Sequence, residues 1–435
     1  MDGTINKIIQ VVGSSAQDCV NYSVTIQNTL SIRDNGSFIQ DIRFTSEDET
    51  DNYPYSLESL SDIVIDSTIN FDSGCVLSDG TILVHKLRTF EIWKSTDEGN
   101  TFTYLSTLSG ITDNFAGRMF VSNSGSIFIG IGGKVFRSND NGNTFTSVLN
   151  LPFTGSSWIN LCVWNFIQDS SDNIYGGVYS LPAEKSTCAY VIKSSDGGST
   201  WTNTIADTSA RHCHVIGINQ YNGWIYACLE GNNPVSNSKV CRSKDNGSTW
   251  VTINTGGQFT GFATKGDSNK IYLGLDNLQD SAVFYINDGG TNSEPFNLLI
   301  NFGDYGFISD MYILPDDNII LWTKRNGATG NAKIIKTTTT DWLNWETVET
   351  SPSLHNWDGY WIGFIYNHSE TTKVFVYRSW SGASGLISIV NGIAIFKFKV
   401  PLIPQNGSLR ELIKKYFTQR VKSLSFAKKW IEKFL

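Results

Sequence analysis

Four aspartates recur in one short motif and are the first residues of this chain that could do chemistry. Asp97, Asp140, Asp196 and Asp245 each hold the third place of the pattern Ser-x-Asp-x-Gly-x-Thr-(Phe/Trp), as in SSDGGSTW at 194–201. A carboxylate can serve as a nucleophile or as a general acid or base. Catalysis needs such a group once or twice in one pocket, and four copies in equivalent places cannot converge on one substrate. A structural role is therefore expected for these aspartates.

The motif has the composition of a tight turn between two strands. An aspartate side chain can accept hydrogen bonds from backbone N–H groups a few residues later. The glycine two places after it, which is Gly99, Gly142, Gly198 or Gly247, permits a positive φ. The closing aromatic residue begins a strand and is expected to pack against the neighbouring strands.

The spacing of the motif predicts the fold. The closing aromatic residues follow one another at steps of 43, 56 and 49 residues, and then at 95, about two steps. They are Phe102, Phe145, Trp201, Trp250 and Trp345, and NDGGTNSEPF at 287–296 supplies a degraded copy in the long gap. Alternating strand pairs with glycine-containing turns precede the motifs. This repeat predicts an all-β fold, a seven-bladed β-propeller with six blades as the alternative, followed by a C-terminal amphipathic α-helix.

Over roughly residues 70–400 the pattern resembles the Asp-box propellers, also called bacterial neuraminidase repeat proteins. The resemblance implies that the motifs lie on the rim, away from the active face. The family includes sialidases, xyloglucan hydrolases, sortilin-type receptors and non-enzymatic assembly factors, so it implies no single function. We expect a propeller over 67–400 and an N-terminal segment over 1–66. One or two strands at 21–44 of that segment close the last blade or form a separate cap.

The resemblance makes demands that a sialidase must meet. Those relatives bind the substrate carboxylate with three arginines, the first in a Phe/Tyr-Arg-Ile-Pro motif that is absent here. Arg43 in DIRFTS is the nearest match and lacks the proline. Arg118 and Arg211 begin predicted inner strands, but a third arginine in a comparable position is missing. A sialidase is therefore not the favoured reading.

Other glycoside hydrolases need two carboxylates about 5–9.5 Å apart. The weak candidates are carboxylates expected at the mouths of blades: Asp113, Glu230, Asp304, Asp310 and Asp358. The sequence pairs no two of them, and each is better explained as a turn residue or a solvated loop carboxylate.

His212 and His214 alternate with Cys213 on a predicted strand, so both imidazoles face one side. Two such histidines can bind a metal ion. Because no carboxylate or other third ligand lies near them in the sequence, polar packing is favoured, and no metal or cofactor is predicted.

Aromatic residues give the stronger functional signal. HNWDGYW at 355–361 and RSWSGASG at 378–385 place Trp357, Tyr360, Trp361 and Trp380 near predicted loops. Aromatic faces stack on sugars and are common in binding surfaces. With Arg118 and Arg211 these residues are the predicted ligand-binding set, for which a cell-surface glycan is the expected ligand. The alternative is that the rings fill gaps between blades.

Charge, cysteine content and the N-terminal sequence limit the binding partners and the cellular compartment that can be expected for this chain. The net charge is −8, but residues 408–435 carry +6, which leaves about −14 on the rest. An acidic body argues against nucleic-acid binding, which depends on basic patches. The seven cysteines lack metal-type spacing and are expected to be buried free thiols. The N-terminus lacks a basic region followed by a long apolar run, so synthesis in the cytoplasm without a signal peptide is expected.

The last segment, 401–435, is predicted to be a linker and a basic amphipathic helix. SLRE at 408–411 is a capping box. At 100° per residue one apolar stripe forms, with lysines opposite; its anchoring residues are Leu412, Tyr416, Leu424, Trp430 and Phe434. The helix is expected to dock on a protein partner. A membrane surface and the chain's own propeller are the alternatives.

Together these features favour a non-catalytic binding or structural propeller that is tethered to a larger assembly by its C-terminal helix. A phage or virus particle component, a tail or surface protein that contacts cell-surface glycans, would reconcile cytoplasmic synthesis with action outside the cell. The competing hypothesis is a glycoside hydrolase of sialidase-like or xyloglucan-hydrolase-like type.

Overall fold

The structure is a computed structural model of the 435-residue chain. It describes residues 3–12, 23–34, 37–46, 57–58, 71–87, 89–99, 101–151, 158–182, 189–231, 237–276, 280–314, 317–325, 330–350, 359–368, 371–381 and 389–398. The chain divides into two compact units, Leu57–Phe398 and a second unit made of Met1–Ser56 with Lys399–Leu435. The predicted helix of 401–435 and its anchoring residues lie outside the described residues.

The second unit contains a three-stranded antiparallel sheet in the order β1-β2-β3. Its strands are β1 (Gly3–Val12), β2 (Ser23–Asp34) and β3 (Ser37–Ser46). Residues 21–44, which the sequence assigns to the last blade or to a cap, thus supply β2 and β3, which pair with each other and with β1.

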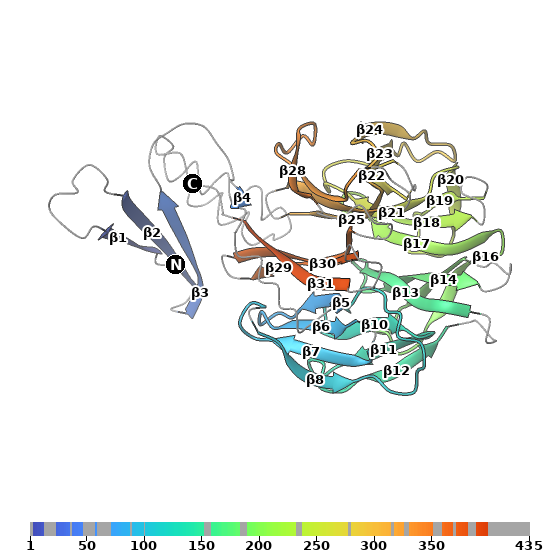
Figure 1. The fold of residues 1–435 in the computed structure, drawn as a ribbon, viewed down its shortest axis with the longest axis horizontal. Helices are drawn as coiled ribbons and strands as arrows, with labels where there is room; N and C mark the ends of the chain where they lie inside the picture. The colour runs from blue at the N-terminus through green and yellow to red at the C-terminus, as the bar shows by residue number, and fades with distance from the viewer. Residues whose placement is uncertain are drawn as a thin grey trace. The chain divides into compact units, whose positions relative to one another are not determined.

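Leu57–Phe398 forms a β-propeller built from short antiparallel strands (Figure 1). Five of its sheets have four strands each, in chain order. The first two contain β5 (Phe71–Val76), β6 (Ile82–Lys86), β7 (Glu91–Ser95) and β8 (Thr103–Thr107), then β9 (Phe120–Val121), β10 (Ile127–Ile131), β11 (Lys134–Ser138) and β12 (Thr146–Asn150). The next two contain β13 (Trp158–Gln168), β14 (Ile174–Pro182), β15 (Ala189–Ser194) and β16 (Thr202–Asp207), then β17 (Ala210–Ile218), β18 (Ile225–Gly231), β19 (Lys239–Ser243) and β20 (Val251–Thr255). The fifth contains β21 (Phe259–Ala263), β22 (Lys270–Leu275), β23 (Ala282–Asn287) and β24 (Asn297–Asn301).

The sixth sheet has eight strands. One half contains β25 (Phe307–Ile313), β26 (Ile319–Lys324), β27 (Lys333–Thr337) and β28 (Trp345–Thr350). The other half contains β29 (Gly359–His368), β30 (Thr371–Ser381), β31 (Ile389–Phe398) and β4 (Leu57–Glu58). One residue pair, Lys324 with Gly359, joins the halves. The all-β propeller is confirmed. The described part of Leu57–Phe398 contains six sheets, in agreement with the alternative of six blades. The predicted seven separate blades are not confirmed, because this pair merges two groups of strands into one sheet.

The first strands of the strand groups surround a central channel. They are β5, β9, β13, β17, β21, β25 and β29, and each contacts the next, with β29 returning to β5. Residues from all seven line a channel of about 580 Å³. We call the face at which these strands begin the start face, and the face at which they end the turn face.

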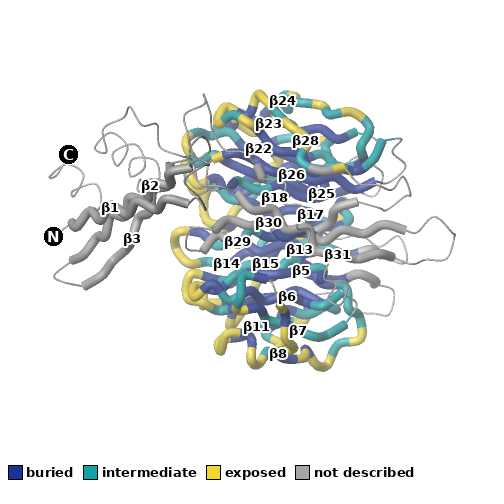
Figure 2. Tube along the Cα trace, turned by 60° about the vertical axis from the view of Figure 1, so that its left-hand side comes forward, coloured by how far each residue is buried: buried dark blue, intermediate teal, exposed yellow. Residues whose placement is uncertain are grey.

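Burial decreases outward along each sheet. All residues of β10, β18 and β26 are buried because these second strands are covered by the neighbouring sheets, whereas almost all residues of the fourth strands β8, β12 and β24 are exposed or of intermediate burial. Figure 2 shows this gradient, with exposed positions gathered at the periphery. The prediction of buried free thiols is confirmed for five cysteines, Cys75, Cys162, Cys213, Cys228 and Cys241. In the part of the chain that the structure describes, no helix is long and apolar enough to span a membrane.

The four repeated aspartates lie in turns between third and fourth strands, on the turn face. In the turn at 194–201, Asp196 Oδ1 accepts hydrogen bonds from the Ser194 hydroxyl at 2.8 Å and the Thr200 N–H at 2.8 Å, and Oδ2 accepts from the Thr200 hydroxyl at 2.6 Å. The same bonds recur at Asp97, Asp140 and Asp245. The glycines have φ between +76° and +85°. Each carboxylate is thus committed to its own turn.

These bonds predict how the protein responds to acid. Hydrogen bonds from the Thr249 hydroxyl and N–H lower the pKa of Asp245 from 3.8 to about 2. A group whose pKa is lower in the folded state contributes stability above its unfolded pKa and loses that contribution as the pH falls through its folded pKa. We expect the free energy of unfolding to fall between pH 4 and pH 2, and to fall less steeply in the Asp245→Asn variant. Urea unfolding at several pH values measures this, and equal slopes for the two proteins would contradict it.

Candidate functional site

Two histidines and a glutamate come together near the start face, on β17 and β18. His212 and Glu230 are direct cross-strand partners. The register between the two strands shifts between Cys213 and Val215, so His214 falls at a β-bulge. Bulges re-aim side chains, and here His214 meets the same carboxylate as His212.

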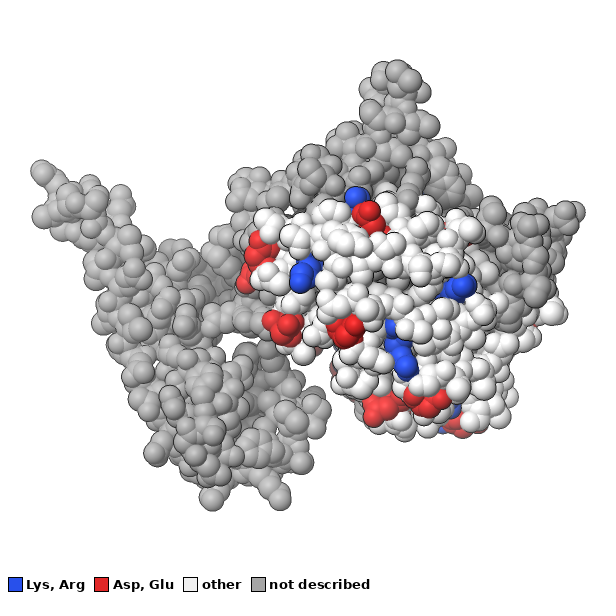
Figure 3. All heavy atoms as spheres, turned by 90° about the horizontal axis from the view of Figure 1, so that it is seen from below, with Lys and Arg blue, Asp and Glu red and all other residues white. Residues whose placement is uncertain are grey.

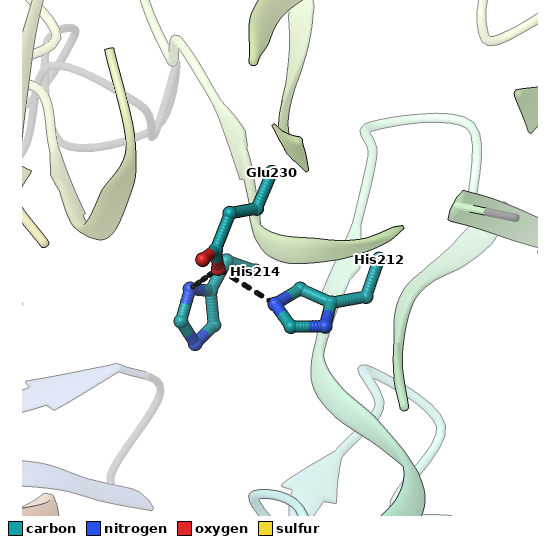
Figure 4. Close-up of side chains that lie close together, drawn as sticks. All are labelled: His212, His214 and Glu230. Atoms are coloured by element: carbon teal, nitrogen blue, oxygen red, sulfur yellow. Dashed lines mark hydrogen bonds and ion pairs between the residues drawn. The ribbon is translucent and has the colours of Figure 1, made fainter. Parts of the chain in front are cut away.

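The Glu230 carboxylate lies between the two imidazoles (Figure 4). Its Oε2 is 2.7 Å from Nε2 of His212 and 2.9 Å from Nδ1 of His214. Its Oε1 accepts a hydrogen bond from the Arg211 guanidinium. Asp276, directly after β22, places Oδ2 3.0 Å from the same His214 Nδ1. We call these five residues the histidine–carboxylate cluster.

The cluster is enclosed, with one edge toward solvent. The His212 side chain is fully buried, whereas that of Arg211 is 27 % exposed. The Tyr179 ring lies 4.2 Å from the His212 ring, and the Trp164 ring lies 5.4 Å from that of His214, measured between centroids. These aromatic walls exclude water, which strengthens every electrostatic interaction inside.

Burial and charge set the protonation of the cluster. Burial lowers the pKa of His212, although the charge of Glu230 opposes the shift. Burial alone would also lower the pKa of His214, but the charges of Glu230 and Asp276 raise it to about 9. Burial alone would raise the pKa of Glu230, yet the positive charge of the two histidines holds it well below its usual range.

A second buried polar group crosses the channel. Arg118 lies two residues before β9, and its guanidinium lies 2.8 Å from Oδ1 of Asp310 on β25. In the ring of first strands, β5 and β29 lie between β9 and β25 on one side, and β13, β17 and β21 on the other. Burial raises the pKa of Asp310 to about 6, although the charge of Arg118 opposes the shift. The ion pair therefore ties opposite sides of the channel together.

The other predicted residues are more dispersed. Asp113 accepts the Phe115 N–H at 3.0 Å, which is a turn contact. The Asp304 carbonyl accepts the Gly330 N–H at 2.8 Å. Tyr360 and Trp361 lie at the beginning of β29 and Trp380 near the end of β30, so their backbone positions share the start face. Trp357 and Asp358 lie outside the described residues.

The expectation that His212 and His214 have no carboxylate nearby is wrong. Glu230 is distant from the histidines in sequence but lies directly opposite His212 on the paired strand, and Asp276 comes from the next sheet. A signal for the first contact exists in the sequence. The turn signal YNG at 221–223 centres a hairpin that pairs residue 212 with residue 230. Asp276 carries no comparable local signal.

Charge is sparse on the described surface shown in Figure 3, where acidic and basic side chains are interspersed and neither sign gathers in a large patch. This distribution offers no basic stripe for a phosphate backbone on that face.

No protein-family model and no curated protein matches the chain. Among solved structures, catalytically inactive virginiamycin B lyase from Staphylococcus aureus with quinupristin is similar at 13 % identity and a TM-score of 0.51, covering 80 % of this chain and 100 % of that one. An oligogalacturonate lyase in complex with manganese is similar at 11 % identity and a TM-score of 0.50, covering 80 % and 97 %. A GH74 enzyme of Niastella koreensis is similar at 17 % identity and a TM-score of 0.49; the match covers 78 % of this chain and spans only 64 % of that enzyme. At these identities the similarity establishes the β-propeller fold alone.

Proposed function

We propose that this protein is a non-catalytic binding β-propeller whose binding surface is its start face. One observation carries the proposal: two of the carboxylates that a hydrolase could use are engaged inside the protein. Asp310 is paired with Arg118, and Glu230 with Arg211 and two histidines. A general acid or nucleophile must reach its substrate, and neither carboxylate is exposed to one.

The architecture behind this proposal is a seven-bladed Asp-box propeller. Its support is the ring of seven first strands and the single residue pair that joins the halves of the eight-stranded sheet. The four identical aspartate turns, all on the turn face, support the Asp-box assignment. With those turns committed to structure, the start face is the surface left for a ligand.

The proposed ligand is a cell-surface glycan, and the aromatic residues around β29 and β30 are its proposed contacts. Tyr360 and Trp361 lie at the beginning of β29 and Trp380 near the end of β30, so their backbone positions share the start face. Trp357 is included from its place in the sequence, three residues before Tyr360. Arg211 offers a half-buried guanidinium on the same face, whereas Arg118 is better placed as the brace of the channel.

Binding to a glycan array by the full chain tests this surface. We expect Trp361→Ala and Trp380→Ala to weaken binding about five- to a hundredfold, since a stacked aromatic ring is worth about 1–3 kcal/mol to the group that lies on it. Tyr221→Ala is the matched control, because Tyr221 is 58 % exposed but lies in the β17–β18 turn on the turn face. Binding that survives both tryptophan substitutions, or that Tyr221→Ala weakens equally, would contradict the assignment.

The proposed tether is the C-terminal segment, through which the propeller joins a larger assembly such as a phage or virus particle. Its support is the apolar stripe opposite lysines in residues 408–435. We expect the full chain to oligomerise without lipid and a chain ending at Gln405 to be monomeric, as measured by size-exclusion chromatography with light scattering. Identical behaviour of the two chains would contradict a tether, and association only with anionic liposomes would assign the segment to membranes.

The alternative, a glycoside hydrolase of sialidase-like or xyloglucan-hydrolase-like type, has one observation in its favour. The pKa of Asp310 is raised to about 6, the range that suits a general acid.

A further inference from the structure

We infer that the histidine–carboxylate cluster binds one divalent transition-metal ion of the zinc class, through four protein ligands. The ligand atoms are Nε2 of His212, Nδ1 of His214, Oε2 of Glu230 and Oδ2 of Asp276. This inference goes beyond the proposed function and does not depend on it, since the ion would serve the fold whatever the start face binds.

The hydrogen bonds of His212 are the first argument. Its Nδ1 lies 2.8 Å from the carbonyl oxygen of Ser180. A carbonyl can only accept, so Nδ1 carries the hydrogen, and in the neutral ring Nε2 presents a lone pair. That lone pair points at Oε2 of Glu230 only 2.7 Å away. Two acceptors at this separation repel each other unless a second ring proton or a metal ion lies between them.

The same arrangement is the one that metal-binding histidines use. Such a histidine donates its other ring N–H to a carbonyl or carboxylate, which fixes the tautomer and the ring orientation. Ser180 performs this role for His212, and Arg211 fixes Glu230 through the oxygen that faces away from the imidazoles. The supporting groups for two ligands are therefore already in place.

His214 supplies the second argument. Its Nδ1 faces two carboxylate oxygens at 2.9 and 3.0 Å, yet makes no hydrogen bond of acceptable geometry, and the residue is only 8 % exposed. A buried polar atom without a hydrogen bond costs free energy. A positive ion beside this nitrogen would satisfy it together with both carboxylates.

The distances suit an ion after a small adjustment. The ligand atoms of His212, His214 and Glu230 all lie within 4.8 Å of one another. Ligands about 2.0–2.2 Å from a tetrahedral zinc ion are roughly 3.4 Å apart. The nitrogen–oxygen pairs at 2.7–3.0 Å must therefore open by about half an ångström, and the two imidazole nitrogens, within 4.8 Å of each other, must approach. Side-chain rotation can supply both movements.

The ligand types select the class of ion. Two imidazoles with two carboxylates suit zinc and its first-row neighbours, whereas calcium and magnesium prefer oxygen ligands alone. Four protein ligands close the coordination sphere, which is the arrangement of structural sites. Because the histidines lie on β17 and Asp276 follows β22, the ion would fasten one sheet of the propeller to the next.

Titration of the metal-stripped full chain with zinc chloride, followed by calorimetry and thermal unfolding, tests the inference. We expect one equivalent to bind and to raise the melting temperature, because a ligand that binds only the folded state stabilises it. Cobalt(II) in place of zinc gives a visible absorption spectrum that reports a four-coordinate nitrogen and oxygen environment, and this measurement needs no variant. Failure of the unaltered chain to bind zinc or cobalt would overturn the inference and leave a proton on His214 as the cation between the carboxylates.

Variants of the cluster test whether the ion binds there. His214→Asn and Asp276→Asn keep hydrogen-bonding amides but remove a ligand, and each is expected to weaken zinc binding at least tenfold. His85→Gln is the matched control: His85 is also fully buried and bonded to one carboxylate, Asp72 at 2.6 Å, and to the Thr89 carbonyl, but among the described residues no second imidazole joins it in a candidate metal site. This control should lower the melting temperature yet keep the zinc-induced rise. Undiminished binding in both cluster variants would overturn the inference, because the ion would then lie elsewhere.

Discussion

Asp310→Leu is expected to lower the free energy of unfolding by about 3–5 kcal/mol at pH 7, the usual cost of removing one partner of a buried ion pair. The reason is that the Arg118 guanidinium, whose side chain is 14 % exposed, would remain charged inside the channel. Its contact with the Tyr312 ring, 5.9 Å from the ring centroid, cannot replace a carboxylate. Urea unfolding measures the change.

The double variant Arg118→Met, Asp310→Leu separates a lost charge partner from lost packing. Replacing both members of a buried pair with apolar residues is often neutral or stabilising, so most of the lost stability should return. Glu91→Gln is the control. It breaks the Lys86–Glu91 pair, in which both side chains are about one-third exposed, and such pairs contribute only about 0–1 kcal/mol. A double variant no more stable than Asp310→Leu would show that the pair is not what holds the two sides of the channel.

Trp342→Ala is expected to cost about 3–5 kcal/mol, as is usual when a fully buried tryptophan is truncated. Trp342 is completely buried, and its ring lies 4.4 Å from that of Tyr272 in the preceding sheet and under the Lys265 ammonium at 4.6 Å. Its backbone, however, has a φ of +64°, which side chains with a Cβ rarely adopt. The position therefore combines favourable packing with backbone strain.

This strain makes a sharp contrast between two substitutions. Trp342→Gly should be less destabilising than Trp342→Ala by about 1 kcal/mol, because glycine tolerates the left-handed conformation. At Trp201, whose φ is not positive, the order should reverse, with glycine worse than alanine. Thermal or urea unfolding of the four variants measures their stabilities. A Trp342→Ala variant more stable than Trp342→Gly would contradict the inferred backbone strain.

Trp342 also shows how a degraded copy of the repeat can be recognised in the sequence. In the four intact motifs a glycine lies three residues before the closing aromatic residue, and Trp342 holds that position before Trp345. The Trp345 indole donates to the Trp342 carbonyl at 3.0 Å, as those of Trp201 and Trp250 do to Gly198 and Gly247. The turn thus persists after both the aspartate and the glycine are lost. The closing tryptophan predicted the turn because this residue, partly buried against its sheet, is the part of the motif that packing retains.

Sequence reasoning was weaker for the site, for physical reasons. The aspartate turns close within eight residues, so their hydrogen bonds can be read locally. His214 meets Glu230 only through a β-bulge, and Asp276 only through the packing of two sheets. Arg118 and Asp310 are nearly two hundred residues apart and meet only because the ring closes. Contacts that depend on closure leave no local pattern.

Product analysis tests most directly whether the start face binds its ligand without cleaving it. The full chain would be incubated with the glycans it retains on an array and with sialoside and xyloglucan substrates, and the recovered sugars weighed by mass spectrometry. We expect every sugar to be recovered intact. Shortened glycans that disappear with Asp310→Asn or Glu230→Gln would contradict it and identify the protein as a glycoside hydrolase.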